Sequence, residues 1–215
     1  MLLMSNYLSI ITNFGCHYSC PYCIVKNNNL NIPKTTLKGL AELPKYLSSG
    51  KYNWVSLSGG GDPLFQFSTN KQWYDKFFES IPKNIKLELH TSYINEKNVP
   101  YEKFDRIVYH LRSIEQLKLV KRIKQQKTRV VFVVSENFTE DLIDSIATYC
   151  DTSSEIDELS FRQMVDSNYQ ETNYCQDYLR MGHQKLWWYI EQNDYNIYYC
   201  ENRIYNEYKK IGEQI

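Results

Sequence analysis

Three cysteines lie close together near the start of the chain, at Cys16, Cys20 and Cys23. They are separated by three and by two residues, so a single loop can turn all three sulfurs toward a common centre. Thiolates are soft ligands that select zinc, copper(I) or iron–sulfur clusters. A structural zinc site needs four protein ligands, and only the adjacent His17 or a distant cysteine is left as the fourth. A cubane iron–sulfur cluster takes one ligand per iron, so three cysteines leave one iron open to a small molecule.

A glycine-rich segment forms the second chemical signal, at Gly59, Gly60, Gly61 and Asp62, hereafter the glycine turn. It follows the β-type run 54–58, where glycines let the backbone approach a ligand closely. A carboxylate beside such a turn can bind an ammonium group. Taken alone, the pattern also fits a plain strand-to-helix turn.

The segment 16–23, hereafter the cysteine loop, resembles the motif of the radical SAM enzymes, CxxxCxφC with an aromatic residue at φ, here Tyr22. The resemblance implies a [4Fe–4S] cluster on the three cysteines, whose free iron is chelated by the amino and carboxylate groups of S-adenosylmethionine. An electron donor such as flavodoxin or ferredoxin reduces the cluster in that family. Reductive cleavage of the sulfonium then yields methionine and a 5′-deoxyadenosyl radical.

The same resemblance assigns roles to residues outside the cysteine loop. The glycine turn is similar to the family's GGE motif, which grips the amino group of S-adenosylmethionine, and Asp62 stands where Glu is usual. Tyr22 is expected near the adenine, and Val131 or Val133 is expected to touch it. His110 occupies a place where the family puts a polar residue that contacts the ribose. A histidine satisfied within the core is the alternative interpretation of His110.

The rest of the chain alternates between strand-like and helix-like patterns. Six strand-like runs are followed by helical spacing of apolar residues, which predicts an α/β fold with a parallel sheet and right-handed crossovers. The resemblance implies a partial (βα)6 barrel. We expect one domain over residues 1–215, with the part from about 175 as a lid or packing segment. The predicted strands are 7–12, 54–58, 85–90, 106–111, 129–134 and 156–165, with a helix over 70–80, another from 114 to 123, a final helix over 178–190 and a short extra strand at 195–200.

Sites on such sheets lie in the loops at the carboxyl ends of the strands. Arg162 and Gln163 fall near the end of the sixth strand, and strand alternation lets only one of them face the barrel. An arginine there can hold a carboxylate or phosphate bidentately, or bridge to a neighbouring loop. We therefore expect a small anionic organic or nucleotide-like substrate. His90, Ser92 and Arg112 are further candidates for contacting it.

Composition limits the other classes of partner. Lys plus Arg and Asp plus Glu both total 25, so no overall field collects nucleic acid, which makes a polynucleotide an unfavoured partner without excluding it. The chain has no run of 18 apolar residues, so no membrane partner is expected. A tight cysteine loop is typical of metal binding in a reducing compartment, which favours the cytoplasm.

Two alternatives remain open. Within enzymes, an activase that generates a glycyl radical on a partner protein would also suit a compact core. Outside enzymes, the cysteines would serve a zinc-stabilised binding protein without catalysis. A brown protein that contains iron and sulfide after anaerobic purification favours either enzyme, and a colourless zinc protein favours the binding protein.

Overall fold

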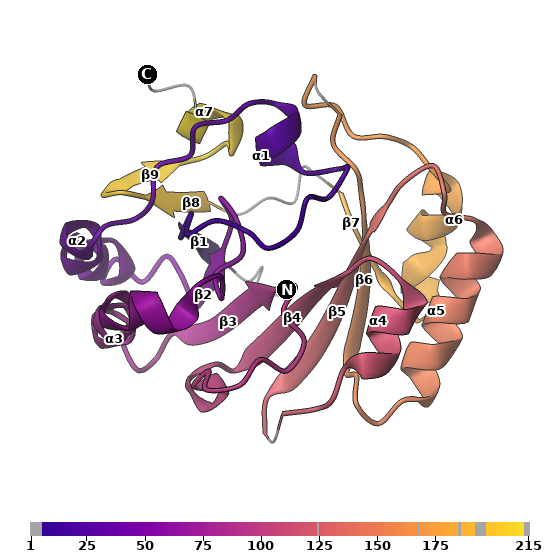
Figure 1. Ribbon diagram of the computed structural model, residues 1–215, viewed down its shortest axis with the longest axis horizontal. Coiled ribbons are helices and arrows are strands. Elements are labelled where there is room, and N and C mark those ends of the chain that lie inside the picture. The colour runs from indigo at the N-terminus through magenta and orange to yellow at the C-terminus, as the bar shows by residue number, and fades with distance from the viewer. Residues whose placement is uncertain (1–5, 124, 167, 185, 192–196, 213–215) are drawn as a thin grey trace.

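A computed structural model describes residues 6–123, 125–166, 168–184, 186–191 and 197–212. Nine strands form a single sheet in the order β7-β6-β5-β4-β3-β2-β1-β8-β9 (Figure 1). Strands β1 to β6 are parallel and neighbour one another in sequence order, as the alternating pattern predicted. Their bounds are β1 Tyr7–Ile11, β2 Trp54–Ser58, β3 Lys86–Thr91, β4 Arg106–Leu111, β5 Lys127–Val134 and β6 Glu158–Gln163.

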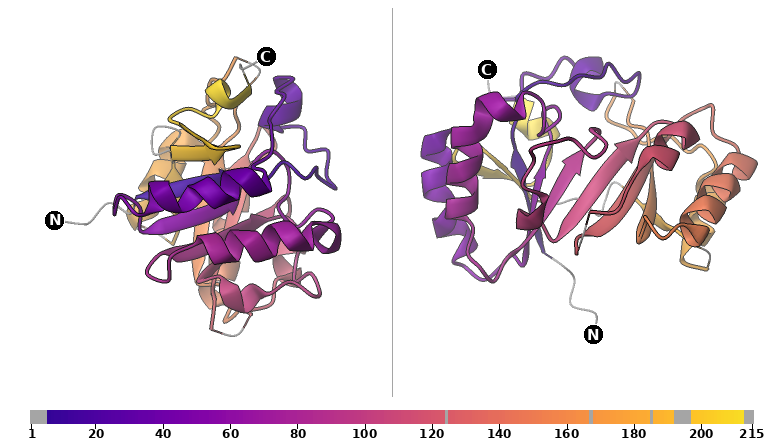
Figure 2. Two further views of the ribbon diagram at one scale, coloured as in Figure 1. Left: turned by 90° about the vertical axis from the view of Figure 1, so that its left-hand side faces the viewer. Right: turned by 60° about the horizontal axis from the view of Figure 1, so that its bottom comes forward.

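The helices lie along the outside of the curved sheet. Figures 1 and 2 show α2 and α3 against one part of it, and α4, α5 and α6 against the other. Outward-facing residues such as Leu57 and Leu89 pack in the main core with Trp73 and Phe77 of α3. The helices are α1 Ile24–Asn27, α2 Leu37–Leu47, α3 Lys71–Ser80, α4 Ile114–Leu119, α5 Glu140–Thr152, α6 Gln176–Arg180 and α7 Lys209–Gly212, with short 3₁₀ turns η1 Phe67–Asn70, η2 Tyr101–Lys103 and η3 Met181–Gln184.

Alternate residues of the same strands face the inside of the curve, and many of them are charged. Arg106 of β4 is buried and bonds Glu88 of β3 at 2.5 Å and Glu158 of β6 at 3.1 Å. It also donates to the Tyr7 hydroxyl at 2.7 Å, and Arg129 bonds Glu158 at 2.5 Å. Buried charges are tolerated when each is paired and hydrogen-bonded. These five residues form a polar floor that closes the amino-terminal part of the barrel interior.

The predicted helix over 178–190 is wrong. The chain instead forms α6, the turn η3 and then the strand β7 Trp188–Ile190, which pairs with β6. Trp187 is buried, and its Nε1 donates to the Leu179 carbonyl at 3.0 Å, which ends the helix. Past that point, Trp188 is exposed and Tyr189 is buried, an alternation that suits the open edge of β6. Pairing to an existing sheet edge overrode the local helical spacing.

The predicted bounds of other elements agree more closely with the structure. The helix expected from 114 to 123 ends at Leu119, because Val120 takes an extended conformation and buries its side chain. The short strand expected at 195–200 is β8 Ile197–Cys200 in the described residues, and it runs parallel to β1. An antiparallel partner, β9 Arg203–Tyr205, completes that edge. Among the described residues, no helix has the length and apolar character needed to cross a bilayer.

Candidate functional site

The cysteine loop connects β1 to α1 and presents three free thiols. Cys16 is exposed, whereas Cys20 and Cys23 are half-buried. The Cys23 amide donates to the Cys20 carbonyl at 3.1 Å, and the Tyr18 amide donates to the Cys16 sulfur at 3.4 Å. Burial raises the pKa of the Cys20 thiol, while the neighbouring Tyr22 hydroxyl and Arg112 act in the opposite direction. The loop is therefore turned and locally bonded, with Tyr22 beside one of its sulfurs.

A stack of aromatic and cationic side chains supports the outer side of the cysteine loop. The guanidinium carbon of Arg112 lies 3.6 Å from the centre of the Tyr18 ring, and Gln116 donates to the Tyr18 hydroxyl at 3.0 Å. His17 lies 3.9 Å from Tyr18 and 3.8 Å from Tyr93, measured between ring centres. The segments after β3 and β4 thus hold the cysteine loop from outside. Arg112, expected as a substrate contact, lies in this stack.

The glycine turn packs directly against the chain that leads into the cysteine loop. The Asp62 amide donates to the Gly15 carbonyl at 2.8 Å. A Cβ on Gly61 would overlap that same carbonyl oxygen, and a Cβ on Gly60 would come within 2.8 Å of Asn13. Gly60 also has a φ of 72°, a left-handed conformation that glycine adopts without strain. The two sequence motifs are therefore neighbours, and glycine is what allows their close approach.

The Asp62 carboxylate lies at the centre of a hydrogen-bond cluster. It is 4% exposed. One oxygen accepts from the Leu64 amide at 2.9 Å and the Thr91 hydroxyl at 2.8 Å, and the other accepts from the amide and hydroxyl of Ser92, both at 2.6 Å. Both oxygens thus have two donors each. Binding of a cofactor ammonium by Asp62 stays a prediction. Ser92, which was a candidate for contacting the substrate, directs its hydroxyl to Asp62.

Tyr208 joins the glycine turn from the far end of the chain. Its hydroxyl accepts from the Gly60 amide at 2.8 Å, and its ring meets Tyr198 of β8 edge-on at 5.3 Å. Burial raises the pKa of the Tyr208 hydroxyl. Sequence reasoning missed Tyr208, because no local pattern marks one tyrosine among 19 as a partner of residue 60.

Two histidines form a chain inside the barrel. His90 Nε2 lies 2.8 Å from a carboxylate oxygen of Glu88, and His90 Nδ1 lies 2.9 Å from His110 Nε2. Burial alone would raise the pKa of Glu88, but His90 and Arg106 hold it below its ordinary range. Burial lowers the pKa of His110 well below its ordinary value, and His90 and Arg162 add to that effect. Glu88 was not among the expected site residues, although its place two residues before His90 puts it on the same face.

The two expected site residues at the end of β6, Arg162 and Gln163, face opposite sides of the strand. Gln163 is 1% exposed, accepts from Thr172 and donates to the Tyr174 carbonyl at 2.8 Å, so it anchors the segment after β6. Arg162 is half-buried on the inner face opposite Val133, its partner in the β5–β6 register. Burial lowers the pKa of the Arg162 guanidinium, while Tyr198, Glu171 and Tyr208 act to raise it. Arg162, Val133 and His110 therefore lie toward the carboxyl ends of their strands, where the cysteine loop and the glycine turn also lie.

The candidate metal ligands are the three thiols of the cysteine loop. In the described part of the chain, no three His, Cys, Asp or Glu side chains are placed to hold one metal ion. A cubane puts each thiolate on a different iron, so its three cysteines need not converge on one point. Three thiols on one short loop, with Tyr22 beside them, fit that requirement in residue type and number.

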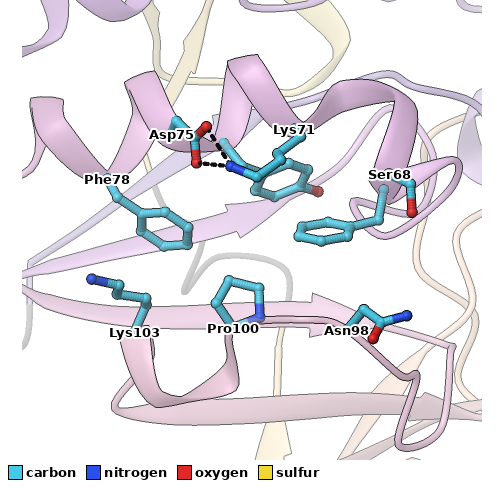
Figure 3. A pocket seen from close by; sticks show the side chains of 9 residues that line it. Ser68, Lys71, Asp75, Phe78, Asn98, Pro100 and Lys103 are labelled. Carbon is cyan, nitrogen blue, oxygen red and sulfur yellow. Dashed lines mark hydrogen bonds and ion pairs between the residues drawn. The ribbon is translucent and has the colours of Figure 1, made fainter.

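A pocket of about 370 Å³ lies elsewhere, between α3 and η2 (Figure 3). Phe67, Tyr74, Phe78 and Pro100 line it, and the Lys71–Asp75 ion pair lies at its edge. The residues that line this pocket belong to η1, α3 and the segment 98–103, and none of them is one of the candidate site residues described above. It is therefore separate from the candidate site.

No family model matches the chain, and no curated protein matches its sequence. Solved structures do match. SuiB of Streptococcus suis bound to the precursor peptide SuiA gives a TM-score of 0.57 at 13% identity, covering 87% of this chain and 49% of that one. SuiB bound to S-adenosylmethionine gives 0.56 at 15% identity, covering 87% and 47%. The enzyme anSMEcpe with bound AdoMet gives 0.54 at 15% identity, covering 86% and 63%.

These similarities concern architecture. The chain spans about half the length of SuiB. At 13–15% identity the match shows a shared fold, and the predicted barrel of parallel strands is confirmed at that level.

Proposed function

Because the chain has the radical SAM fold, we propose that it binds a [4Fe–4S] cluster and S-adenosylmethionine and catalyses radical hydrogen abstraction from a small anionic substrate. The observation that carries the proposal is the contact between the two motifs. The Asp62 amide bonds the Gly15 carbonyl at 2.8 Å, so the glycine turn lies at the base of the cysteine loop. The specific cysteine motif and the weaker glycine-rich pattern, 43 residues apart by their Cys16 and Gly59 positions, therefore support one site.

Cys16, Cys20 and Cys23 would hold the cluster, and the backbone of the glycine turn would lie against the cofactor. When bound together, the cluster and S-adenosylmethionine supply one-electron chemistry that produces a carbon radical. SuiB and anSMEcpe have been solved with this cofactor, which supports its assignment here. The half-buried Tyr22 is placed beside Cys20 to pack against a ligand at the loop.

The barrel residues would position the substrate. Arg162 lies on the inner face of β6, and a guanidinium there could hold a carboxylate or phosphate of the substrate bidentately. The polar floor of Tyr7, Glu88, Arg106, Arg129 and Glu158 closes the barrel below it, so substrate would enter from the carboxyl ends of the strands. Enclosure of the reacting groups excludes water and fixes the distance to the target hydrogen.

Anaerobic reconstitution tests the proposal. The wild-type chain should take up about four irons, as one cubane requires, and form 5′-deoxyadenosine from S-adenosylmethionine under reduction. Cys16→Ala, Cys20→Ala and Cys23→Ala should each lose iron and nucleoside formation. Cys175→Ala, whose half-buried thiol lies on another segment, should retain both. Zinc in place of iron, with no nucleoside formed, would reject the proposal and favour a zinc-stabilised binding protein. Full activity in any of the first three variants would reject the assignment of the cluster to these cysteines.

A peptide or protein substrate is the second candidate, and the match to SuiB bound to a precursor peptide favours it. The partner protein on which an activase would act belongs to the same class of substrate. Adding candidate substrates separates the two candidates. Short anionic metabolites should stimulate 5′-deoxyadenosine formation if the substrate is small. Stimulation by peptides alone would favour the second candidate.

A further inference from the structure

We propose that the pocket between α3 and η2 is a second binding site, and that it takes a small aromatic carboxylate. Its volume of about 370 Å³ lies at the lower end of the range of roughly 300–1,000 Å³ that small-molecule sites span. One compact ligand fits such a space, whereas a length of peptide does not. None of the lining residues belongs to a strand, the cysteine loop or the glycine turn, so this site does not depend on the proposed function.

The pocket has an aromatic wall on one side and a proline on the other. Phe67, Tyr74 and Phe78 form the aromatic wall, with tilted rings whose centres are 4.5 Å apart for Phe67 and Tyr74 and 6.4 Å apart for Tyr74 and Phe78. Figure 3 shows the Phe78 ring facing Pro100 across the pocket. Aromatic rings prefer tilted and edge-to-face contacts with other rings, so a ring on the ligand continues an arrangement that the wall already has.

The aromatic wall is held from behind and is therefore formed before a ligand arrives. Tyr74 is 1% exposed, and its hydroxyl donates to the Pro63 carbonyl. The Phe78 ring meets Phe104 edge-on, with ring centres 5.5 Å apart. Phe67 and Phe78 are only half-buried, so part of each ring is left uncovered. Because these rings are already ordered by their neighbours, a ligand pays little to order them on binding.

The charged groups at the rim of the pocket select an anion. Lys71 donates to both carboxylate oxygens of Asp75, at 2.9 and 2.6 Å, so these two charges compensate each other. Lys103 is exposed, and its ammonium forms no ion pair or hydrogen bond with any residue that the structure describes. Figure 3 shows Lys103 at the same end of the pocket as Phe78, with Asn98 and Ser68 at the other end. The rim thus carries one uncompensated positive charge, which a carboxylate matches one to one.

Titration of the full chain with 3-phenylpropionate, followed by amide shifts in ¹H–¹⁵N spectra, tests this site. We expect saturable shifts at residues 67–78 and 98–103, with a Kd at about the millimolar level for so small a ligand. Its amide, 3-phenylpropionamide, keeps the ring and lacks the charge, so it should bind about two- to fivefold more weakly, as expected for the loss of one exposed ion pair. 3-Cyclohexylpropionate keeps the charge and lacks the aromatic ring, and it should bind at least about twofold more weakly because the contacts between rings are lost.

Two lysine substitutions separate Lys103 from the general charge of the chain. Lys103→Met removes the charge and keeps an apolar stem, and Lys118→Met does the same at an exposed lysine of α4, against the other part of the sheet. Lys103→Met should bind the acid about two- to fivefold more weakly than the wild type and the amide equally well. Lys118→Met should bind both as the wild type does, and the same spectra report that each variant is folded.

The outcomes that would overturn the site and those that would overturn its ligand are distinct. No saturable shift at about 10 mM acid, or shifts centred on other segments, would reject the pocket as the site. Equal affinity of the wild type for acid and amide, or a preference for the acid that Lys103→Met retains, would reject recognition of the carboxylate by Lys103. Equal weakening in Lys118→Met would do so too, and tighter binding of 3-cyclohexylpropionate would reject the aromatic class.

Discussion

The Asp62 carboxylate holds two loops together at the carboxyl edge of the sheet. It receives donors from its own turn, at Leu64, and from the end of β3, at Thr91 and Ser92. Asp62 therefore fixes the separation of β2 and β3 where the cofactor is proposed to bind.

Replacing Asp62 by Asn should destabilise the chain. The amide turns one acceptor oxygen into a donor, which then faces donors of Thr91 or Ser92. We expect a loss of about 1–3 kcal/mol in the free energy of unfolding, measured by urea denaturation. Affinity for S-adenosylmethionine should fall as well while iron content is kept.

Asp75→Asn is the matched control, because Asp75 is an exposed carboxylate of α3 that forms an ion pair with the exposed Lys71. Its effect should stay within about 0.5 kcal/mol. Equal stability of the Asp62 and Asp75 variants would contradict the structural role of Asp62.

The buried Glu88 and the half-buried His110 should make the chain sensitive to acid in two separate windows. Both have a pKa below the ordinary value in the folded chain, so the unfolded chain binds more protons as pH falls. Stability should therefore decrease below about pH 6.5, where unfolded His110 protonates, and again below about 4.5, where unfolded Glu88 does.

Urea unfolding at a series of pH values checks this. His110→Gln should flatten the profile between about pH 7 and 5, and Glu88→Gln should flatten only the lower part. A wild-type profile that rises as pH falls from 7 to 5 would show that the sign assigned to His110 is wrong.

At the scale of elements, the contact between the glycine turn and the cysteine loop depends on the absence of a side chain. Gly61→Ala places a methyl group against the Gly15 carbonyl, and a backbone atom cannot move aside as a side chain would. We expect a loss of about 1–3 kcal/mol in unfolding free energy and reduced cluster uptake.

Gly50→Ala provides the comparison. Gly50 also has a positive φ, at 69°, but its Cβ would meet nothing within 4 Å. Its substitution should cost about 1 kcal/mol through backbone strain and leave iron content unchanged. Normal iron content in Gly61→Ala would argue that the turn tolerates a shift of the loop.

How far the sequence predicts this molecule depends on whether an element's partners are local. The strands β2, β4 and β5 were predicted within about two residues because each combines β-branched residues with apolar runs, and β3 because apolar and polar residues alternate along it. The helix predicted over 178–190 was wrong, because pairing with the edge of β6 decides the structure there, and not the helical spacing of the segment's own apolar residues. The cysteine loop and glycine turn were recognisable from residue type and spacing. Tyr208 and Glu88 were not, because their partners are defined only when distant segments meet.

At the scale of the whole molecule, the sheet brings the carboxyl-terminal strands beside β1 and the segment that follows the cysteine loop. β8 pairs with β1, and a second apolar cluster joins Ile11 and Ile32 to Tyr205 and Ile211. Val25 and Leu30 pack on the same cluster, so α1 and the segment after the cysteine loop rest on the carboxyl-terminal strands. Figure 2 shows α1 and α7 at the same end of the molecule in both views.

Removal of the Tyr208 hydroxyl should therefore affect a site far away in sequence. Tyr208→Phe leaves the Gly60 amide without its acceptor, and we expect a loss of about 1 kcal/mol in unfolding free energy. Hydrogen exchange of the glycine turn should also become faster, as measured by mass spectrometry.

Tyr46→Phe is the control, since the Tyr46 hydroxyl makes an exposed bond to the Asn202 carbonyl. It should leave exchange at residues 59–62 unchanged. Equally fast exchange in both variants would mean that Tyr208 acts through general stability and not through its bond to Gly60.

The bond between Gly60 and Tyr208 spans 148 positions of sequence, and it sets an order of events during synthesis. The ribosome makes the cysteine loop and the glycine turn early, whereas the tyrosine that completes the turn arrives after all six barrel strands have been made. Contacts this distant form late in folding, because a long loop must close first. The nascent chain therefore exposes the three thiols of the cysteine loop before Tyr208 is available to bond the glycine turn.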